Sequence, residues 1–189
     1  MEGKVIIISA PSGCGKSTII KALEDRGNVK LEFSVSATNR APRQGEVDGV
    51  NYHFLTTEQF HDLIAQNAFV EYEEVYPGRF YGTLRSEVEN RCAAGSNVIL
   101  DIDVKGGVNV ARMFGEKAVS IFIMPPSIEE LRHRLENRAT DAPEMIAERV
   151  GKAEYEISFA PQYDHRVIND NLDKAVEQTE KIILDFINK

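Results

Sequence analysis

The residues with the clearest chemistry lie between a short apolar run and the helix that follows it. Val5–Ser9 predicts a buried strand, and the next residues match the phosphate-loop pattern G-x-x-x-x-G-K-[ST], with Ala10 in place of the first glycine. Loop amides and a helix N-terminus present partial positive charge to a phosphate. Lys16 adds a full charge at the β- and γ-phosphates, and the Ser17 hydroxyl is a ligand for Mg²⁺. The loop predicts a nucleoside triphosphate site.

A second chemical signal is the acid that closes another apolar strand. Val98–Leu100 is continuously apolar and is followed by Asp101. In phosphate-loop enzymes such an acid lies beside the loop and helps to hold Mg²⁺, usually through water. The alternative is that Asp simply favours the turn after a strand. Asp103 would lie on the same side as Asp101 if the strand continued that far.

Two groups of arginines suit further phosphate oxygens. Arg40 and Arg43 lie three residues apart in a loop over 38–49 that is rich in Gly, Pro and charge, where they either bind a second anion or remain solvated at the surface. The helical segment over about 126–158 contains four more arginines, which either close over a transferring phosphoryl group or pair with the interleaved glutamates: Arg132, Arg134, Arg138 and Arg149.

The elements that must position these residues predict an α/β fold. Val5–Ser9, Val98–Leu100 and Val119–Met124 show no alternation, which is typical of parallel strands buried between helix layers. The strands over about 35–83 are short, alternating and joined by turns, which favours a small antiparallel insert. We expect one domain with a phosphate-loop core (about 1–34, 84–125 and 159–189), the β-rich insert and a helical lid over about 126–158.

Composition limits the function classes. The net charge of −8 argues against a general nucleic-acid or membrane surface, and no apolar segment is long enough to cross a bilayer. The N-terminus lacks the features of a signal peptide. Cys14 and Cys92 have no metal-binding spacing, so a reducing cytoplasm is expected. The place of Cys14 beside Lys16 and a helix N-terminus favours its thiolate.

Beyond these signals, the chain resembles the guanylate kinase family, the ATP-dependent nucleoside monophosphate kinases that act on GMP. The likeness runs nearly end to end, through SAPSGCGKST, FSVSATNRAPRQGEVDGVNYHF, FVEYEE, FYGT, ILDID and RVIND. The second of these segments is highly specific to the family. One extra residue between Glu71 and Tyr81, around Pro77–Phe80, departs from the family pattern.

The resemblance implies a GMP site in the insert. The phosphate would be held by two arginines and two tyrosines, namely Arg40, Arg43, Tyr52 and Tyr81. The guanine would be surrounded by Ser36, Glu71, Thr83 and Asp103. Guanine offers N1–H and an exocyclic amine as donors, and ionised carboxylates are acceptors only, so this assignment agrees with the chemistry of the base.

The resemblance also implies an ATP site and a set of catalytic groups. ATP would be bound by Asn169 near the adenine and by the loop and helix start Ala10, Pro11, Ser12, Gly13, Cys14, Gly15, Lys16, Ser17 and Thr18. Ser17 and Asp101 would serve Mg²⁺. The catalytic residues would be Lys16, Arg40, Arg138 and Arg149.

These implications describe a kinase that converts ATP and GMP, and dGMP as well, into ADP and the diphosphate in purine nucleotide recycling, as a monomer or small homo-oligomer. Two alternatives remain. Guanylate-kinase-like modules of scaffold proteins bind phosphopeptides without catalysis, although they typically lose the ATP-side groups that this chain keeps. A related kinase could use another acceptor, although Glu71 and Asp103 would then lack donors.

Overall fold

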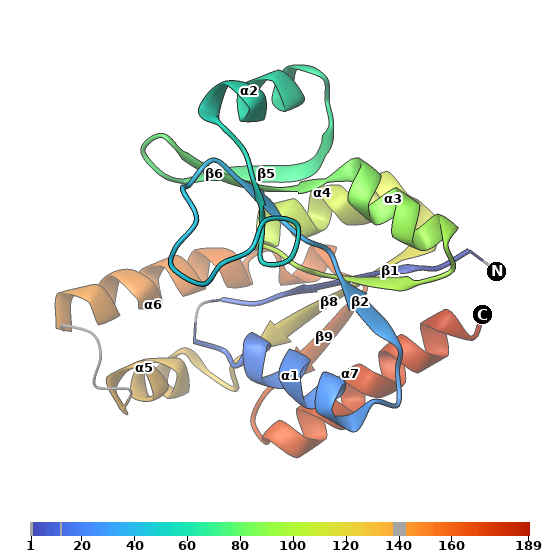
Figure 1. Cartoon of the computed structure of the whole chain (residues 1–189). Coiled ribbons are helices and arrows are strands. Elements are labelled where there is room, and N and C mark those ends of the chain that lie inside the picture. The colour runs from blue at the N-terminus through green and yellow to red at the C-terminus, as the bar shows by residue number, and fades with distance from the viewer. Residues whose placement is uncertain (1, 12, 138–142) are drawn as a thin grey trace.

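A parallel sheet forms the centre of the computed structural model, which describes residues 2–11, 13–137 and 143–189 (Figure 1). Within these residues the sheet has the order β2-β7-β1-β8-β9, and every neighbouring pair is parallel. The expected parallel core is confirmed. Its strands are β1 (Val5–Ser9), β2 (Leu31–Phe33), β7 (Asn97–Asp101), β8 (Ala118–Met124) and β9 (His165–Ile168).

Helices cover both faces of this sheet, and two short 3₁₀ turns, Gly115–Lys117 and Ala160–Gln162, precede β8 and β9. None of the helices in the described part of the chain is both long and apolar enough to cross a membrane. The helices are α1 (Lys16–Arg26), α2 (Thr57–Ala65), α3 (Arg85–Ala93), α4 (Val104–Phe114), α5 (Ile128–Asn137), α6 (Pro143–Ile157) and α7 (Leu172–Ile187).

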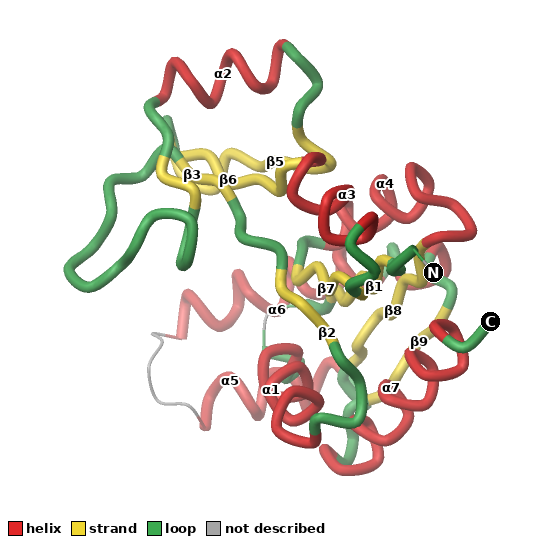
Figure 2. The backbone as a smooth tube through the Cα atoms, turned by 45° about the vertical axis from the view of Figure 1, so that its right-hand side comes forward, coloured by secondary structure: helices red, strands yellow, loops and turns green. Residues whose placement is uncertain are grey.

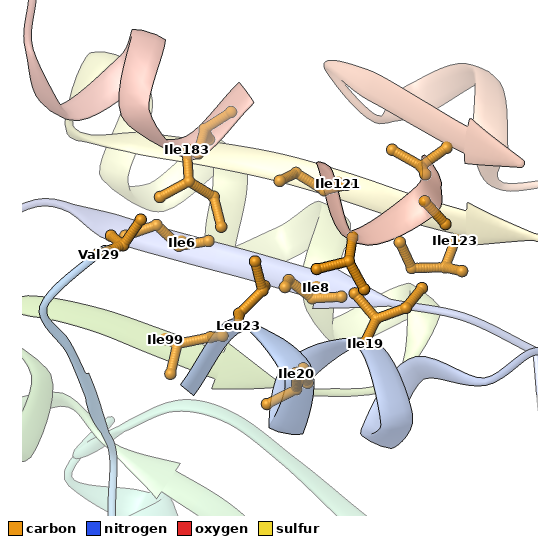
Figure 3. Close-up of a cluster of buried hydrophobic side chains, with 14 residues drawn as sticks. Ile6, Ile8, Ile19, Ile20, Leu23, Val29, Ile99, Ile121, Ile123 and Ile183 are labelled. Carbon is orange, nitrogen blue, oxygen red and sulfur yellow. The ribbon is translucent and has the colours of Figure 1, made fainter. Parts of the chain in front are cut away.

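Alternate residues of β1 face opposite helix layers, which holds the strand firmly at the centre. Ile6 and Ile8 pack with side chains of α1, α7 and β8 in the cluster of Figure 3. Val5 and Ile7 pack with buried side chains of α3, α4 and β7. Each fully buried isoleucine or valine contributes about 1.5–3 kcal/mol to folding. The end of β1 is therefore a rigid base for the loop that follows it.

The insert is a separate four-stranded sheet in the order β4-β3-β6-β5, with α2 packed against it (Figure 2). The expectation of an antiparallel insert is wrong for one pair, because β3 and β4 are parallel. The long loop between these two strands lets the chain return in the same direction. The strands are β3 (Ala37–Thr38), β4 (His53–Phe54), β5 (Phe69–Tyr76) and β6 (Arg79–Leu84).

Local signals in the sequence place several helix ends correctly. Thr56 and Gln59 form both hydrogen bonds of a capping box at α2, and Gly27 ends α1 in the left-handed conformation. At α5 only one of the two hydrogen bonds of a capping box forms: Glu130 N donates to Ser127 Oγ at 3.1 Å, but the Glu130 carboxylate accepts from Arg134. This one hydrogen bond satisfies one of the otherwise unpaired backbone N–H groups in the first turn of the helix.

Candidate active site

The phosphate loop connects β1 to α1 in a conformation that requires glycine. Gly13 and Gly15 have φ angles of 92° and 86°. A Cβ on Gly15 would lie 2.4 Å from Asn169 Nδ2, and a Cβ on Gly13 would lie 2.9 Å from Leu135 Cδ2. Both glycines therefore permit left-handed backbone and close packing at the same time. Ser12, which was expected to bind ATP, lies outside the described residues.

Asn169 supports the loop through a side-chain hydrogen bond. The residue is 6% exposed, and Nδ2 donates a hydrogen bond of 2.8 Å to the carbonyl of Cys14. Its backbone is fixed as well, because Asn169 N donates to Met124 O and Asn169 O accepts from Arg134 Nη1, both at 2.8 Å. The side-chain amide is thus engaged with the loop backbone, a contact that the sequence did not predict.

Cys14 faces away from solvent, into a cluster built by α5 and α6. It is fully buried with Leu131, Leu135 and Val150. Burial raises the pKa of its thiol to about 12. The expectation of a thiolate-prone cysteine is therefore wrong, because desolvation outweighs the nearby positive charge. The phosphate loop and the helical pair α5–α6 share one small core.

Lys16, the first residue of α1, meets Asp101 at the end of β7. Asp101 is paired with Ile8 in the β1–β7 register, and its carboxylate contacts the Lys16 ammonium. Ser17 and Thr18 are exposed on the first turn of α1. A cavity of about 430 Å³ gathers the described loop residues with acidic groups; its lining includes Ala10, Pro11, Gly13, Gly15, Lys16, Ser17, Thr18, Asp101, Asp103 and Glu156. The cavity thus brings together seven of the residues expected to bind ATP: Ala10, Pro11, Gly13, Gly15, Lys16, Ser17 and Thr18.

Asp103 does not continue the strand, because β7 ends at Asp101. Asp103 instead caps α4: its Oδ1 accepts from the backbone N of Lys105 and Gly106 at 2.8 and 3.1 Å. A short polar side chain at the N-cap satisfies otherwise unpaired amides. Asp103 therefore reaches the site from a helix start rather than from a strand.

The carboxylate of Glu71 has a strongly raised pKa. Thr83 Oγ1 donates to Glu71 Oε1 at 2.6 Å across β5 and β6. Burial raises the pKa of Glu71 to about 7; the Thr83 hydrogen bond lowers it, and the charge of Asp103 raises it further. Glu71 lies against the start of α4, since a Cβ on Gly106 would be in ordinary van der Waals contact with Glu71 Cβ at 3.5 Å. Glu71 and Asp103 line the same cavity.

Two further cavities adjoin the one at the phosphate loop. One of about 450 Å³ is lined by Glu71, Asp103 and Lys105, and one of about 170 Å³ is lined by Ser36, Thr83 and Asp101. Each shares an aspartate with the loop cavity. The four expected base-binding residues are thus distributed around two hollows that open next to the loop.

Arg40 lies among aromatic rings in the loop between β3 and β4. Its guanidinium carbon is 5.3 Å from the ring centre of Tyr52, whose ring lies 5.9 Å from that of Tyr81. The side chain is 10% exposed and forms an ion pair with Glu46. Arg43 is exposed. The structure thus brings Arg40, Tyr52 and Tyr81 together, while Arg43 lies at the outer surface of the same loop.

The turn between β5 and β6 is where the resemblance implies one extra residue. The β5–β6 ladder shifts between Glu74 and Tyr76, and Gly78 takes a positive φ of 74°. Thr83 still pairs with Glu71. A second register shift lies between Phe69 and Glu71, but the pairing of Glu71 with Thr83 is kept between the two shifts.

The lid arginines differ in their surroundings. Arg134 is structural, since its Nε donates to Glu130 at 2.8 Å and its Nη1 donates to Asn169 O. Arg132 is exposed, and Arg149 is half-buried on α6. Arg138 lies outside the described residues. Two glutamates were not predicted from the sequence. Glu46 pairs with Arg40, and Glu156 lines the cavity at the phosphate loop; no sequence motif links either glutamate to these neighbours.

Comparisons with known proteins agree with this geometry. The family model for guanylate kinase matches residues 2–185. A guanylate kinase of Bacteroides thetaiotaomicron is 54% identical over 189 residues, covering 100% of this chain and 92% of that protein. One of Porphyromonas gingivalis is 53% identical over 186 residues, covering 98% and 99%.

A solved structure extends the likeness to the fold. The crystal structure of guanylate kinase from Anaplasma phagocytophilum superposes with a TM-score of 0.74 at 33% identity, and covers 100% of this chain and 88% of that one. The parallel five-stranded sheet and the small mixed insert match that fold. On family model, sequence identity and fold together, the chain belongs to the guanylate kinase family.

Proposed function

We propose that the protein transfers the γ-phosphoryl group of ATP to GMP, and to dGMP, between two adjoining half-sites. The observation that carries this proposal is the adjacency of the two half-sites: the loop cavity with Lys16 shares Asp103 with the cavity of Glu71. A donor phosphate on the loop and an acceptor base at Glu71 would lie on either side of Asp103. Such positioning supplies much of the catalysis in phosphoryl transfer.

The acceptor side would recognise guanine through its donors. An ionised Glu71 accepts from N1–H and the exocyclic amine, with Ser36, Thr83 and Asp103 around the base. Adenine would leave the buried carboxylate unpaired, which penalises the wrong base. The phosphate would be bound by Arg40, Tyr52 and Tyr81, with Arg43 reaching it from the surface of the loop. No strong base is needed, because the acceptor phosphate is anionic at neutral pH.

The donor side would hold ATP on the loop amides from Ala10 to Thr18, with Lys16 at the β- and γ-phosphates and Asn169 supporting the loop near the adenine. Arg138 and Arg149 would neutralise charge on the transferring group from the lid over 126–158. The insert over 35–83 and this lid would close around both nucleotides on the core (1–34, 84–125 and 159–189), which limits hydrolysis.

The residues present also fit Mg²⁺. The Ser17 hydroxyl and the Asp101 carboxylate supply hard oxygen ligands, and Asp101 already lies beside the loop. Within the described residues, no group of three or more His, Cys, Asp or Glu side chains is placed to hold a metal ion. Mg²⁺ is usually bound through one or two carboxylates, with phosphates and water as its other ligands. When bound, the ion would neutralise charge on the ATP phosphates. We further propose a cytoplasmic monomer or small homo-oligomer; the free thiols of Cys14 and Cys92 agree with a reducing compartment.

The test is ADP formation from ATP with GMP, dGMP, AMP, UMP and CMP in turn, with and without Mg²⁺. We expect turnover with the two guanine nucleotides and much less with the others. If AMP or a pyrimidine nucleotide were preferred, that nucleotide would be the acceptor, and the assignment of GMP would be wrong. An absence of turnover with every acceptor would favour the phosphopeptide-binding alternative.

A further inference from the structure

We infer that Glu46 is a positioning residue, which orients Arg40 so that one edge of its guanidinium group is presented to the acceptor phosphate. This inference rests on the proposed function, because it assigns the anion at Arg40 as the phosphate of GMP. Glu46 lies in the long loop between β3 and β4, which projects from the insert in Figure 2.

The contact between the two side chains is a bidentate fork. Arg40 Nη1 donates to Glu46 Oε2 at 2.8 Å, and Arg40 Nη2 donates to Glu46 Oε1 at 2.9 Å. This parallel pair fixes the plane of the guanidinium group as well as its position. Arg40 lowers the pKa of the Glu46 carboxyl to about 2, with help from the backbone of Arg43. Glu46 is therefore ionised throughout the neutral range.

The fork leaves one edge of Arg40 available. The guanidinium group has five N–H donors. Two from Nη1 reach Glu46 Oε2 and the carbonyl of Ala41, and one from Nη2 reaches Glu46 Oε1. The remaining donors are Nε–H and the second N–H of Nη2, which share one edge of the group. Nε is buried and has no hydrogen-bond partner among the described residues.

That edge has the geometry for a phosphate. Two parallel N–H groups match two phosphate oxygens. The Tyr81 hydroxyl lies close enough to Arg40 to raise its pKa through hydrogen bonding, and Tyr52 is beside it. Because a buried donor without a partner is unfavourable, a ligand oxygen that accepts from Nε removes that cost. Glu46 and the Tyr52 ring thus fix the guanidinium group beside Tyr81, the second tyrosine expected to bind the phosphate.

Glu46 also fixes the backbone of the second arginine. Arg43 N donates to Glu46 Oε2 at 2.6 Å, and Glu46 N donates to Arg43 O at 3.0 Å. The turn over 43–46 is thus closed from both sides. One carboxylate therefore sets the side chain of Arg40 and the main chain at Arg43.

The direction in which one substitution changes the affinity for GMP distinguishes a positioning role from a simple charge effect. Glu46→Gln removes a negative charge near the phosphate, so charge alone predicts tighter GMP binding. Positioning predicts the opposite, because an amide accepts at one oxygen only and its NH₂ group opposes an arginine nitrogen. We expect the dissociation constant of GMP to rise about tenfold, that of guanosine to change less than about twofold, and KM for ATP to stay the same.

The variants are compared by calorimetry with GMP and guanosine and by steady-state kinetics. Glu58→Gln, on the exposed face of α2, is the matched control and should behave as wild type. In an Arg40→Lys background, Glu46→Gln should add little, because the fork is already lost. An unchanged KM for ATP reports that the variant is folded.

Three results would overturn the inference: tighter or unchanged GMP binding by Glu46→Gln, an equal loss of guanosine binding, or full additivity with Arg40→Lys. Failure of the proposed function is distinct, since the wild type itself would then not phosphorylate GMP.

Discussion

The hydroxyl of Thr83 donates a hydrogen bond of 2.6 Å to the carboxylate of Glu71, directly across the β5–β6 pair. This contact and the neighbouring Asp103 act in opposite directions on Glu71, but burial has the largest effect and raises its pKa to about 7. The group that would read guanine is therefore close to half-ionised at neutral pH when no ligand is bound.

The first prediction concerns Glu71 and pH. Its folded pKa is above the ordinary value of 4.5, so the folded state binds more protons than the unfolded state between that value and about 7. The contribution of Glu71 to stability therefore falls as pH rises through this window. Glu71→Gln should gain stability relative to wild type at about pH 8, on the order of 2 kcal/mol, and little at about pH 4. Urea unfolding at both pH values measures this.

The affinity for guanosine should depend on pH through the same ionisation of Glu71. Guanosine has no phosphate to titrate, so its affinity for wild type should rise as pH increases through about 7, because only the ionised Glu71 accepts from both donors. The Glu71→Gln variant should bind GMP more weakly by roughly 1–3 kcal/mol and show no such pH dependence. A flat wild-type profile would exclude Glu71 from the base site.

The second prediction concerns Lys16, which contacts Asp101 at the mouth of the loop. Lys16→Ala should nearly abolish turnover, because the charge at the β- and γ-phosphates is lost, while GMP binding remains measurable by calorimetry. Lys21→Ala, exposed on the same helix, serves as the control and should keep full activity. Comparable turnover in both variants would refute the role of Lys16.

The third prediction concerns Gly15. Gly15→Ala should disrupt the loop, because the backbone has φ 86° and the new Cβ would lie 2.4 Å from Asn169 Nδ2. Gly78→Ala has a comparable φ of 74° with nothing within 4 Å, so it isolates the backbone strain of roughly 1 kcal/mol. KM for ATP should rise strongly in the first variant and little in the second. Equal effects on thermal stability and on KM would show that the Asn169 contact is unimportant.

The fourth prediction concerns the reactivity of the thiols. Burial raises the pKa of Cys14 to about 12, whereas Cys92 is only half-buried. Iodoacetamide should therefore label Cys92 well before Cys14 in the native protein, and both at similar rates in guanidinium chloride. Peptide mapping by mass spectrometry measures the order. Preferential labelling of Cys14 in the folded state would contradict its place in the core shared with α5 and α6.

Local features of the chain were sufficient to predict much of this protein. The apolar runs at Val5–Ser9 and Val119–Met124, the phosphate loop and the capping box at Thr56 act through neighbouring backbone groups, so their outcome can be inferred from a short window of sequence. The resemblance of longer segments to the guanylate kinase family indicated that the phosphoryl acceptor is GMP. The strands, the loop and the cap have the same hydrogen-bonding and burial requirements in any protein that contains them.

Tertiary structure decided how distant segments meet. It placed β3 parallel to β4, buried Cys14 under α5 and α6, engaged Arg134 with Asn169, and set Glu46 on Arg40. It also brought Glu71 against the first turn of α4 and raised its pKa. Burial, charge proximity and side-chain pairing depend on which surfaces pack together, and sequence spacing does not specify those contacts. The sequence by itself determined which side chains are available for the chemistry. The packing of distant segments determined the protonation state of these side chains and which groups they face.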